Sequence, residues 1–196
     1  MTSLPFRAAL VALLQIAVLG WMVFERAAIL RDGAEVVLKV ELVDPRDLFR
    51  GEYVTLSYAI NTIPADIVAD RAQEGVDDEG YRITRRGPIT VRLAPGADGN
   101  WTPVAAFLGK PPAEAPTGQV DIRGETSRGA SLDPGGTVWV SYGLDRFYVP
   151  EGEGRPLESR MGEGTFSVVV AVASDGTPQI KALRESGRTL YAEPFF

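Results

Sequence analysis

The chain contains no histidine and no cysteine among its 196 residues. Without cysteine it has no disulfide framework, no thiol nucleophile and no lipid-modified cysteine. Without histidine it lacks the commonest general base and the commonest ligand of catalytic zinc. The mechanisms that remain open are carboxylate pairs, Ser–Lys dyads and Mg²⁺ or Ca²⁺ held by carboxylates, and no cofactor is expected.

An excess of positive charge is also missing, because the net charge is −6. Nucleic-acid binding requires a basic surface, so a nucleic-acid partner is not expected. With 45% hydrophobic and 23% charged residues the composition is that of a folded protein rather than a disordered one. The length allows one domain or two small ones.

One long apolar run lies near the N-terminus. Residues 8–24 contain a single strongly polar residue, Gln15, and residues 4–6 extend the run to about 20 residues, the length of a bilayer-spanning helix. Trp21 and Arg26 are placed as interfacial anchors. A cleaved signal peptide is the alternative, but its apolar core is usually shorter. The run therefore predicts a transmembrane anchor at 8–24 that contacts the lipid bilayer.

The charges that flank this run indicate its orientation. Arg7 and the amino group precede it without any acidic residue, whereas the other side mixes acidic and basic residues. The positive-inside rule then places residues 1–7 in the cytoplasm. We expect a single-pass membrane protein with an extracytoplasmic C-terminal domain.

The rest of the chain is predicted to be mainly β. Apolar residues alternate with polar ones in 35–44 and in 52–60, where Val54, Leu56, Tyr58 and Ile60 share one face. The Asp-Gly pairs at 98–99 and 175–176 each predict a β-hairpin. One short helix is predicted over 64–75, and a Pro-rich extended linker over 109–118.

Two similar motifs suggest an internal repeat. "GEYVTLSY" (51–58) resembles "GGTVWVSY" (135–142), and both are preceded by a strand and followed by an insertion and an Asp-Gly hairpin. Chance similarity of β-rich segments is the alternative, but the order of the pieces repeats as well. We predict two β units, 34–116 and 117–196, packed into a two-unit antiparallel β-sandwich or barrel-like domain.

Glu52 places a carboxylate on the inward face of its predicted strand, where it should not be buried without a partner. The favoured interpretation is structural: Glu52 accepts backbone N–H bonds or pairs with Arg46 or Arg50. The alternative is a ligand-binding or catalytic acid at a strand end. Tyr53 points to the opposite side and is a candidate surface contact.

A second candidate segment runs from Tyr148 to Glu158 and contains Glu151 and Glu153 between glycines. Three carboxylates could bind Ca²⁺, although their spacing does not match an EF-hand. A solvated loop in which Arg155 pairs with the acids is the favoured interpretation. A third interpretation, ranked between these two, is a loop that binds a protein partner.

The first motif resembles the signature of the GDYXXLXY family. Gly51, Tyr53, Leu56 and Tyr58 match it, and Glu52 stands where the signature has Asp. The resemblance extends to "DPRDLFRG" before the motif and to "YGLDRFYVPEGEGRPLE" at 142–158. It implies an uncharacterised membrane-anchored bacterial protein, often encoded beside or fused to a multi-spanning membrane protein. It brings no catalytic residues.

The sequence therefore favours a non-enzymatic accessory or assembly partner of an integral, multi-spanning membrane protein. The predicted contact residues are Arg50, Glu52, Tyr53, Tyr148, Glu151, Glu153 and Glu158. One alternative is an envelope hydrolase that uses Glu52 with one of the later glutamates. Another is a small-ligand or calcium-binding module in a cleft between the two units.

Overall fold

The structure is a computed structural model that describes residues 4–41, 53–69, 75–76, 82–83, 86–127, 130–161 and 165–193. The predicted contact residues Arg50 and Glu52 lie outside these ranges, as does Arg46. The predicted mainly β fold with an N-terminal apolar helix is confirmed.

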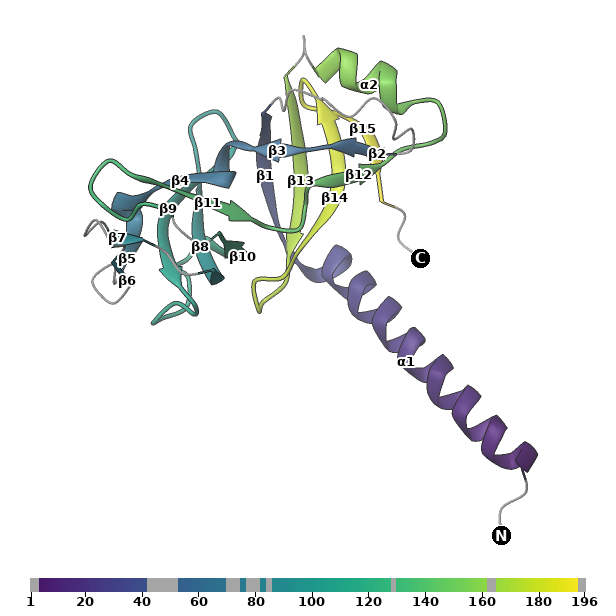
Figure 1. Ribbon diagram of the computed structural model, residues 1–196. Helices are drawn as coiled ribbons and strands as arrows, with labels where there is room; N and C mark the ends of the chain where they lie inside the picture. The colour runs from purple at the N-terminus through teal and green to yellow at the C-terminus, as the bar shows by residue number, and fades with distance from the viewer. Residues whose placement is uncertain are drawn as a thin grey trace.

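A single long helix, α1 (Leu4–Asp32), extends away from the β strands (Figure 1). The described side chains from Phe6 to Arg26 are all exposed. Its segment Ala8–Asp32 is long and apolar enough to cross a membrane. A membrane anchor and a signal sequence both have these properties. The helix continues past the predicted end of the apolar run at residue 24 and reaches the β domain.

α1 enters the β domain without a linker. Leu30 is only 3% exposed, and the backbone N–H of Gly33 donates to the carbonyl of Ile29 at 2.9 Å. A Cβ at Gly33 would lie 2.5 Å from that carbonyl oxygen and 3.1 Å from the backbone of Val172, which is closer than side-chain carbons pack. Glycine therefore lets the end of α1 dock against the strands.

Two mainly antiparallel sheets form most of the domain (Figure 1). The five-stranded sheet has the order β15 (Arg188–Ala192), β14 (Pro178–Glu185), β13 (Phe166–Val172), β1 (Ala34–Glu41), β3 (Ser57–Tyr58). The six-stranded sheet has the order β4 (Thr62–Pro64), β11 (Thr137–Ser141), β10 (Val120–Thr126), β8 (Gly87–Pro95), β9 (Trp101–Leu108), β5 (Val68–Ala69). Two-stranded ribbons pair β2 (Tyr53–Thr55) with β12 (Arg146–Tyr148), and β6 (Gly75–Val76) with β7 (Arg82–Ile83). Among the described pairs only β5 with β9 is parallel.

Both Asp-Gly hairpins are present, joining β8 to β9 and β13 to β14. The predicted inward row of Val54, Leu56, Tyr58 and Ile60 is confirmed, because all four are buried in one shared core. This burial is what fixes the strand faces.

The helix predicted over 64–75 is wrong at the residues that the structure describes, and residues 70–74 lie outside the described part. Residues Ala65–Ile67 form a single 3-10 turn (η2), and β5 follows. The backbone N–H of Ala65 donates to the carbonyl of Gly136 at 2.8 Å, and Val68 is buried in the sheet. Sheet pairing on both sides of the turn overrides the weak helical pattern. The one short helix is instead α2 (Gly154–Met161).

Four consecutive strands have the same order and register in the two sheets, β3-β1-β13-β14 in one and β11-β10-β8-β9 in the other. In β1 and β13 Leu38 faces Val168, and in β10 and β8 Ile122 faces Val91. When motif 51–58 is aligned with 135–142, Leu38 corresponds to Ile122. When the turn 98–99 is aligned with 175–176, Val91 corresponds to Val168, so the two facing pairs are equivalent. The β-bulge after Arg92 in the first hairpin likewise maps onto the bulge after Val169 in the second.

Strands from the predicted units 34–116 and 117–196 interleave, because both sheets contain strands from each. β1 pairs with the hairpin of the second unit, and β10 pairs with the hairpin of the first. Such an exchange joins the two units through backbone hydrogen bonds. The internal duplication itself stays a prediction, supported by this equivalence of register.

Candidate functional site

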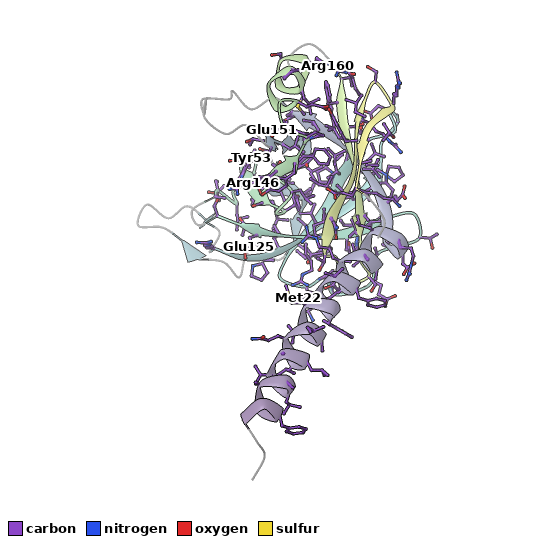
Figure 2. All side chains as sticks on the ribbon, turned by 90° about the vertical axis from the view of Figure 1, so that its right-hand side faces the viewer. Met22, Tyr53, Glu125, Arg146, Glu151 and Arg160 are labelled. Carbon is purple, nitrogen blue, oxygen red and sulfur yellow. The ribbon has the colours of Figure 1, made fainter. Side chains whose placement is uncertain are left out.

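The ribbon of β2 and β12 brings two of the predicted contact residues together. Tyr53 lies directly opposite Tyr148 in the strand register, and their ring centroids are 5.9 Å apart at an angle of 60°. This tilted geometry is favourable for two aromatic rings. Tyr148 is 67% exposed. Figure 2 shows Tyr53 with Arg146 and Glu151 on one side of the β domain, away from Met22 on α1.

Arg146 completes the cluster. Its guanidinium carbon lies 5.3 Å from the centroid of the Tyr53 ring, a cation–π arrangement. Its Nε also lies 3.5 Å from a carboxylate oxygen of Asp145, and both side chains are mostly exposed. Arg146 is not among the contact residues predicted from the sequence, although its position two residues before Tyr148 in a strand puts both on the same face. We call Tyr53, Arg146 and Tyr148 the aromatic patch.

Buried residues hold the aromatic patch from below. Val54 and Phe147 face each other on the inner side of the ribbon, and Val149 continues this row. α2 covers them with Leu157 and Met161, which are one helical turn apart and both buried. The patch therefore stands on a packed ribbon and not on an isolated loop.

α2 corrects the solvated loop predicted for the segment from Tyr148 to Glu158. The segment is a strand end, a turn and then the first residues of a helix. Pro156 lies in the first turn of α2, where a missing N–H does no harm. The Leu157–Met161 spacing was the available signal for this helix. The side chains of Arg155 and Glu158 lie outside the described part.

Two predicted acidic residues have different surroundings. Glu151 is exposed in the turn before α2. Glu153 accepts a hydrogen bond from the hydroxyl of Tyr191 in β15. That hydrogen bond, and then burial, raises the pKa of Tyr191. The ring of Tyr191 in turn packs 6.2 Å from that of Phe147. Glu153 thus ties the turn to the five-stranded sheet, which is a structural role.

The described residues hold no cluster of three or more His, Cys, Asp or Glu side chains suited to a metal ion. The calcium-binding alternative therefore gains nothing from the part of the chain that the structure describes. The hydrolase alternative depends on Glu52, which is outside that part.

A hollow of about 230 Å³ lies where the two predicted units meet. Its lining includes Thr55, Ser57 and Tyr58 from one unit and Trp139, Ser141 and Tyr142 from the other. Asn61 closes part of it by donating to the carbonyl of Val140 at 2.7 Å. The hollow is small and mostly apolar, and it begins beside the aromatic patch because Thr55 pairs with Arg146.

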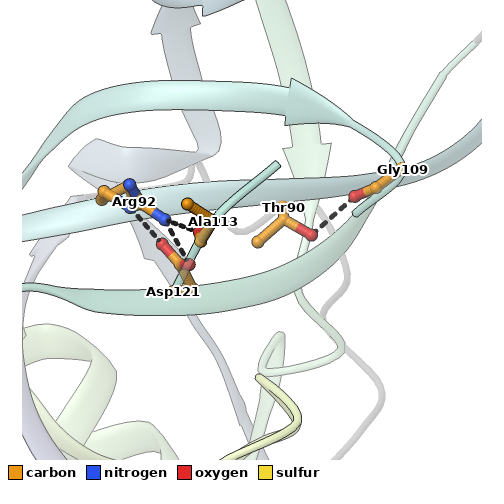
Figure 3. A network of polar contacts seen from close by, with 5 residues as sticks. All are labelled: Thr90, Arg92, Gly109, Ala113 and Asp121. Carbon is orange, nitrogen blue, oxygen red and sulfur yellow. Dashed lines mark hydrogen bonds and ion pairs between the residues drawn. The ribbon is translucent and has the colours of Figure 1, made fainter. Parts of the chain in front are cut away.

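The Pro-rich linker predicted at 109–118 is fixed to the six-stranded sheet (Figure 3). Arg92 makes two hydrogen bonds to the carboxylate of Asp121, at 2.7 and 2.8 Å, and a third to the carbonyl of Ala113. Thr90 donates to the carbonyl of Gly109 at 2.7 Å. These contacts hold residues 109–118 against the sheet, and we call this segment the strap.

A family model for the GDYXXLXY protein matches residues 15–183 of this chain. The chain belongs to the GDYXXLXY family. The match includes the ribbon of β2 and β12, α2 and both Asp-Gly turns, and it ends within β14. Neither the comparison with curated proteins nor the comparison with solved structures gave a match.

Proposed function

We propose that this GDYXXLXY protein is held in the bacterial inner membrane by α1 and presents its β domain outside the cytoplasm. There it acts without catalysis as an accessory or assembly partner of a multi-spanning membrane protein. The observation that carries this proposal is the aromatic patch. Tyrosine and arginine are enriched at protein interfaces. The side chain of Tyr148 is 67% exposed, so packing within the domain does not account for a tyrosine at this position.

The position of the patch supports a contact above the membrane. α1 docks on the strands through Leu30 and Gly33, and the patch lies on the part of the domain away from α1 (Figure 2). The helix would hold the domain at a fixed height, because it continues without a break from the apolar run into the domain. The partner surface would then belong to an extracytoplasmic loop or domain.

Arg146 gives the patch a charge preference. Its guanidinium lies over Tyr53 and is only loosely paired with Asp145, at 3.5 Å between exposed groups. An exposed ion pair of this kind contributes little to stability. Arg146 would therefore favour a partner that offers a carboxylate together with apolar or aromatic side chains.

The test is affinity purification of the full-length tagged protein from native membranes in a mild detergent, followed by mass spectrometry. We expect a multi-spanning protein in stoichiometric amount. The double variant Tyr53→Ser, Tyr148→Ser should lose it, because the rings supply most of the apolar contact. Val104→Ser is the control, since Val104 is an apolar residue 43% exposed on β9 and lines neither the patch ribbon nor the hollow beside it.

Thermal unfolding of each variant must show that the fold is intact. Retention of the partner by the double variant, or equal loss with Val104→Ser, would remove the aromatic patch from the proposal. Absence of any integral membrane protein from the wild-type sample would contradict the accessory role. A reporter fused after Phe196 that is active only in the cytoplasm would contradict the orientation.

A further inference from the structure

A groove of about 1190 Å³ lies at the end of the β domain from which α1 leaves. The strap forms one of its walls, and the turn of the β13–β14 hairpin forms another. Asp32 and Ala34, the last residue of α1 and the first of β1, also line it. Figure 1 shows the tip of this hairpin beside the junction of α1 and β1. A groove of this size can accommodate a small ligand or the polar part of a lipid.

Both walls of the groove are fixed by hydrogen bonds. The strap is held by Arg92, which donates to the carbonyl of Ala113 at 2.8 Å (Figure 3). The hairpin turn is held by the backbone N–H of Arg123, which donates to the carbonyl of Gly176 at 2.9 Å. A Cβ at Gly176 would lie 2.7 Å from Cγ of Arg123, so glycine lets the turn come this close. The groove is therefore preformed and is not a gap between loose loops.

The length of α1 sets the height of the groove above the membrane. A hydrocarbon core of about 30 Å takes about 20 helical residues at about 1.5 Å each. Counted from the start of the span Ala8–Asp32, the core ends at Ala27, and Asp32 lies about 7.5 Å further along the helix. The headgroup layer on each side of the core is about 5–7 Å thick. Because α1 enters the domain without a linker, the groove beside Asp32 lies next to the lipid headgroups.

The groove is lined by charges of both signs. Six charged residues line it, four acidic and two basic, and three of the acids are paired with an arginine within 3.2 Å. In the part of the chain that the structure describes, Lys110 and Glu114 have neither an ion pair nor a hydrogen bond, and both are exposed. The charge left free in the groove is therefore one cation and one anion. The three pairs are Asp32–Arg31, Asp121–Arg92 and Asp175–Arg123.

These two free charges complement a headgroup that carries a phosphate and a primary ammonium. We propose that the groove binds the headgroup of such a phospholipid from the adjoining leaflet, with Lys110 donating to the phosphate and Glu114 accepting from the ammonium. Charge-assisted hydrogen bonds of this kind are stronger than neutral ones. This inference rests on the membrane anchor of the proposed function and not on its multi-spanning partner.

The same pairing distinguishes phosphatidylethanolamine from other phospholipids. The nitrogen of phosphatidylcholine carries three methyl groups and donates no hydrogen bond. Phosphatidylglycerol has no cation for Glu114, and the groove has no excess of positive charge to attract its negative headgroup. Phosphatidylethanolamine is therefore the lipid expected to bind.

Native mass spectrometry of the full-length protein, purified in a mild detergent, tests this preference. The protein is titrated with phosphatidylethanolamine, phosphatidylcholine and phosphatidylglycerol that share the same acyl chains. We expect one phosphatidylethanolamine per chain to bind at a several-fold lower concentration than either of the other lipids. Equal binding of the three lipids would overturn the proposal, because lipid that merely coats α1 does not distinguish the headgroups.

Variants of the two free charges test the site itself. Lys110→Gln and Glu114→Gln each remove one charge but keep a long polar side chain, and each should weaken the binding of phosphatidylethanolamine several-fold. Lys110→Arg, which keeps the charge, should retain most of it. Glu125→Gln and Arg188→Gln are the matched controls, since both residues are exposed and neither lines the groove. Unchanged binding in both groove variants, or an equal loss in the controls, would overturn the site.

Cell fractionation separates a failure of this inference from a failure of the proposed function. If the protein is shortened at its N-terminus and soluble, the anchor fails and the lipid site fails with it. If the protein is full-length and in the membrane but shows no headgroup preference, only the lipid site fails.

Discussion

The hydroxyl of Tyr58 donates a hydrogen bond to the carbonyl of Leu144 at 2.8 Å, and the hydroxyl of Tyr142 donates one to the carbonyl of Ile60 at 2.9 Å. The two tyrosines correspond in the predicted repeat, and so do the two acceptors. Burial raises the pKa of both phenols, with the negative charge of Asp145 adding to the effect at Tyr58. Both hydroxyls therefore stay protonated as donors, and they join the two halves reciprocally.

Tyr58→Phe and Tyr142→Phe should reduce the free energy of unfolding by similar amounts, about 1–2 kcal/mol each, because each leaves a buried carbonyl without its donor. Denaturant unfolding of the full chain in detergent, followed by fluorescence, measures this. Tyr148→Phe is the control, because its ring is largely exposed and its change should stay within about 0.5 kcal/mol. A clear loss in one variant and none in the other would contradict the equivalence of the two halves.

The strap should be released by Arg92→Ala. The Arg92 and Asp121 side chains are only 11% and 17% exposed, so the variant leaves a carboxylate partly buried without its cation. We expect a loss of about 2–4 kcal/mol in the free energy of unfolding. Limited proteolysis should also begin to cut within 109–118, because Ala113 loses its contact to the guanidinium.

Arg86→Ala is the control for the strap. Arg86 pairs with Glu125 at 3.9 Å, and both side chains are at least 70% exposed, so its removal should change stability by less than about 0.5 kcal/mol. If Arg92→Ala is no less stable than Arg86→Ala and the strap stays uncut, the ion pair does not hold it.

Local patterns predicted the parts of the fold that local physics determines. Val36 and Leu38 are both fully buried, whereas Glu35 and Lys39 on either side of them are exposed. The turns at Gly99 and Gly176 have φ values of +80° and +88°, which glycine adopts readily, so Asp-Gly marked both hairpins. The helix prediction failed at residues 64–69 because their structure depends on strands that are distant in the sequence, β11 and β9.

The candidate site was predictable in its chemistry but not in its geometry. The sequence predicts Tyr53 and the segment that begins at Tyr148 as separate contact regions, and only the register of β2 on β12 places the two tyrosines opposite each other. That register is set by long-range packing of Val54 against Phe147, which no local pattern reveals. Arg146 was missed because it contributes to the patch only once Tyr53 lies beside it.

Asp175 should make the stability of the domain depend on pH. Hydrogen bonds from the backbone and hydroxyl of Thr177, together with the nearby Arg123, lower its pKa below the ordinary 3.8. A lowered carboxylate pKa in the folded state stabilises the fold above the unfolded-state pKa and loses that effect as pH falls through the folded value. The free energy of unfolding should therefore fall below about pH 4.

Asp175→Asn tests this contribution, since an amide keeps much of the shape but does not titrate. Denaturant unfolding at pH 7 and at pH 3 should show a smaller pH difference in Asp175→Asn than in the wild type. Glu114→Gln, at an exposed position on the strap, should leave the pH difference unchanged. An identical pH difference in Asp175→Asn and wild type would mean that other groups account for it.

The junction between α1 and β1 should be sensitive to a single methyl group. In Gly33→Ala the new Cβ would lie 2.5 Å from the carbonyl oxygen of Ile29 and 3.1 Å from the backbone of Val172, and neither group is a flexible side chain. We expect a loss of about 1–3 kcal/mol, typical of overpacking, and a lower melting temperature in detergent. Trypsin should also cut faster after Arg31, because the helix end would lift from the strands.

Gly20→Ala is the matched control, since a Cβ there meets nothing within 4 Å. If both variants have the melting temperature of the wild type, α1 is not docked as closely as Leu30 and Gly33 indicate. The fixed height of the β domain above the membrane would then have no structural basis.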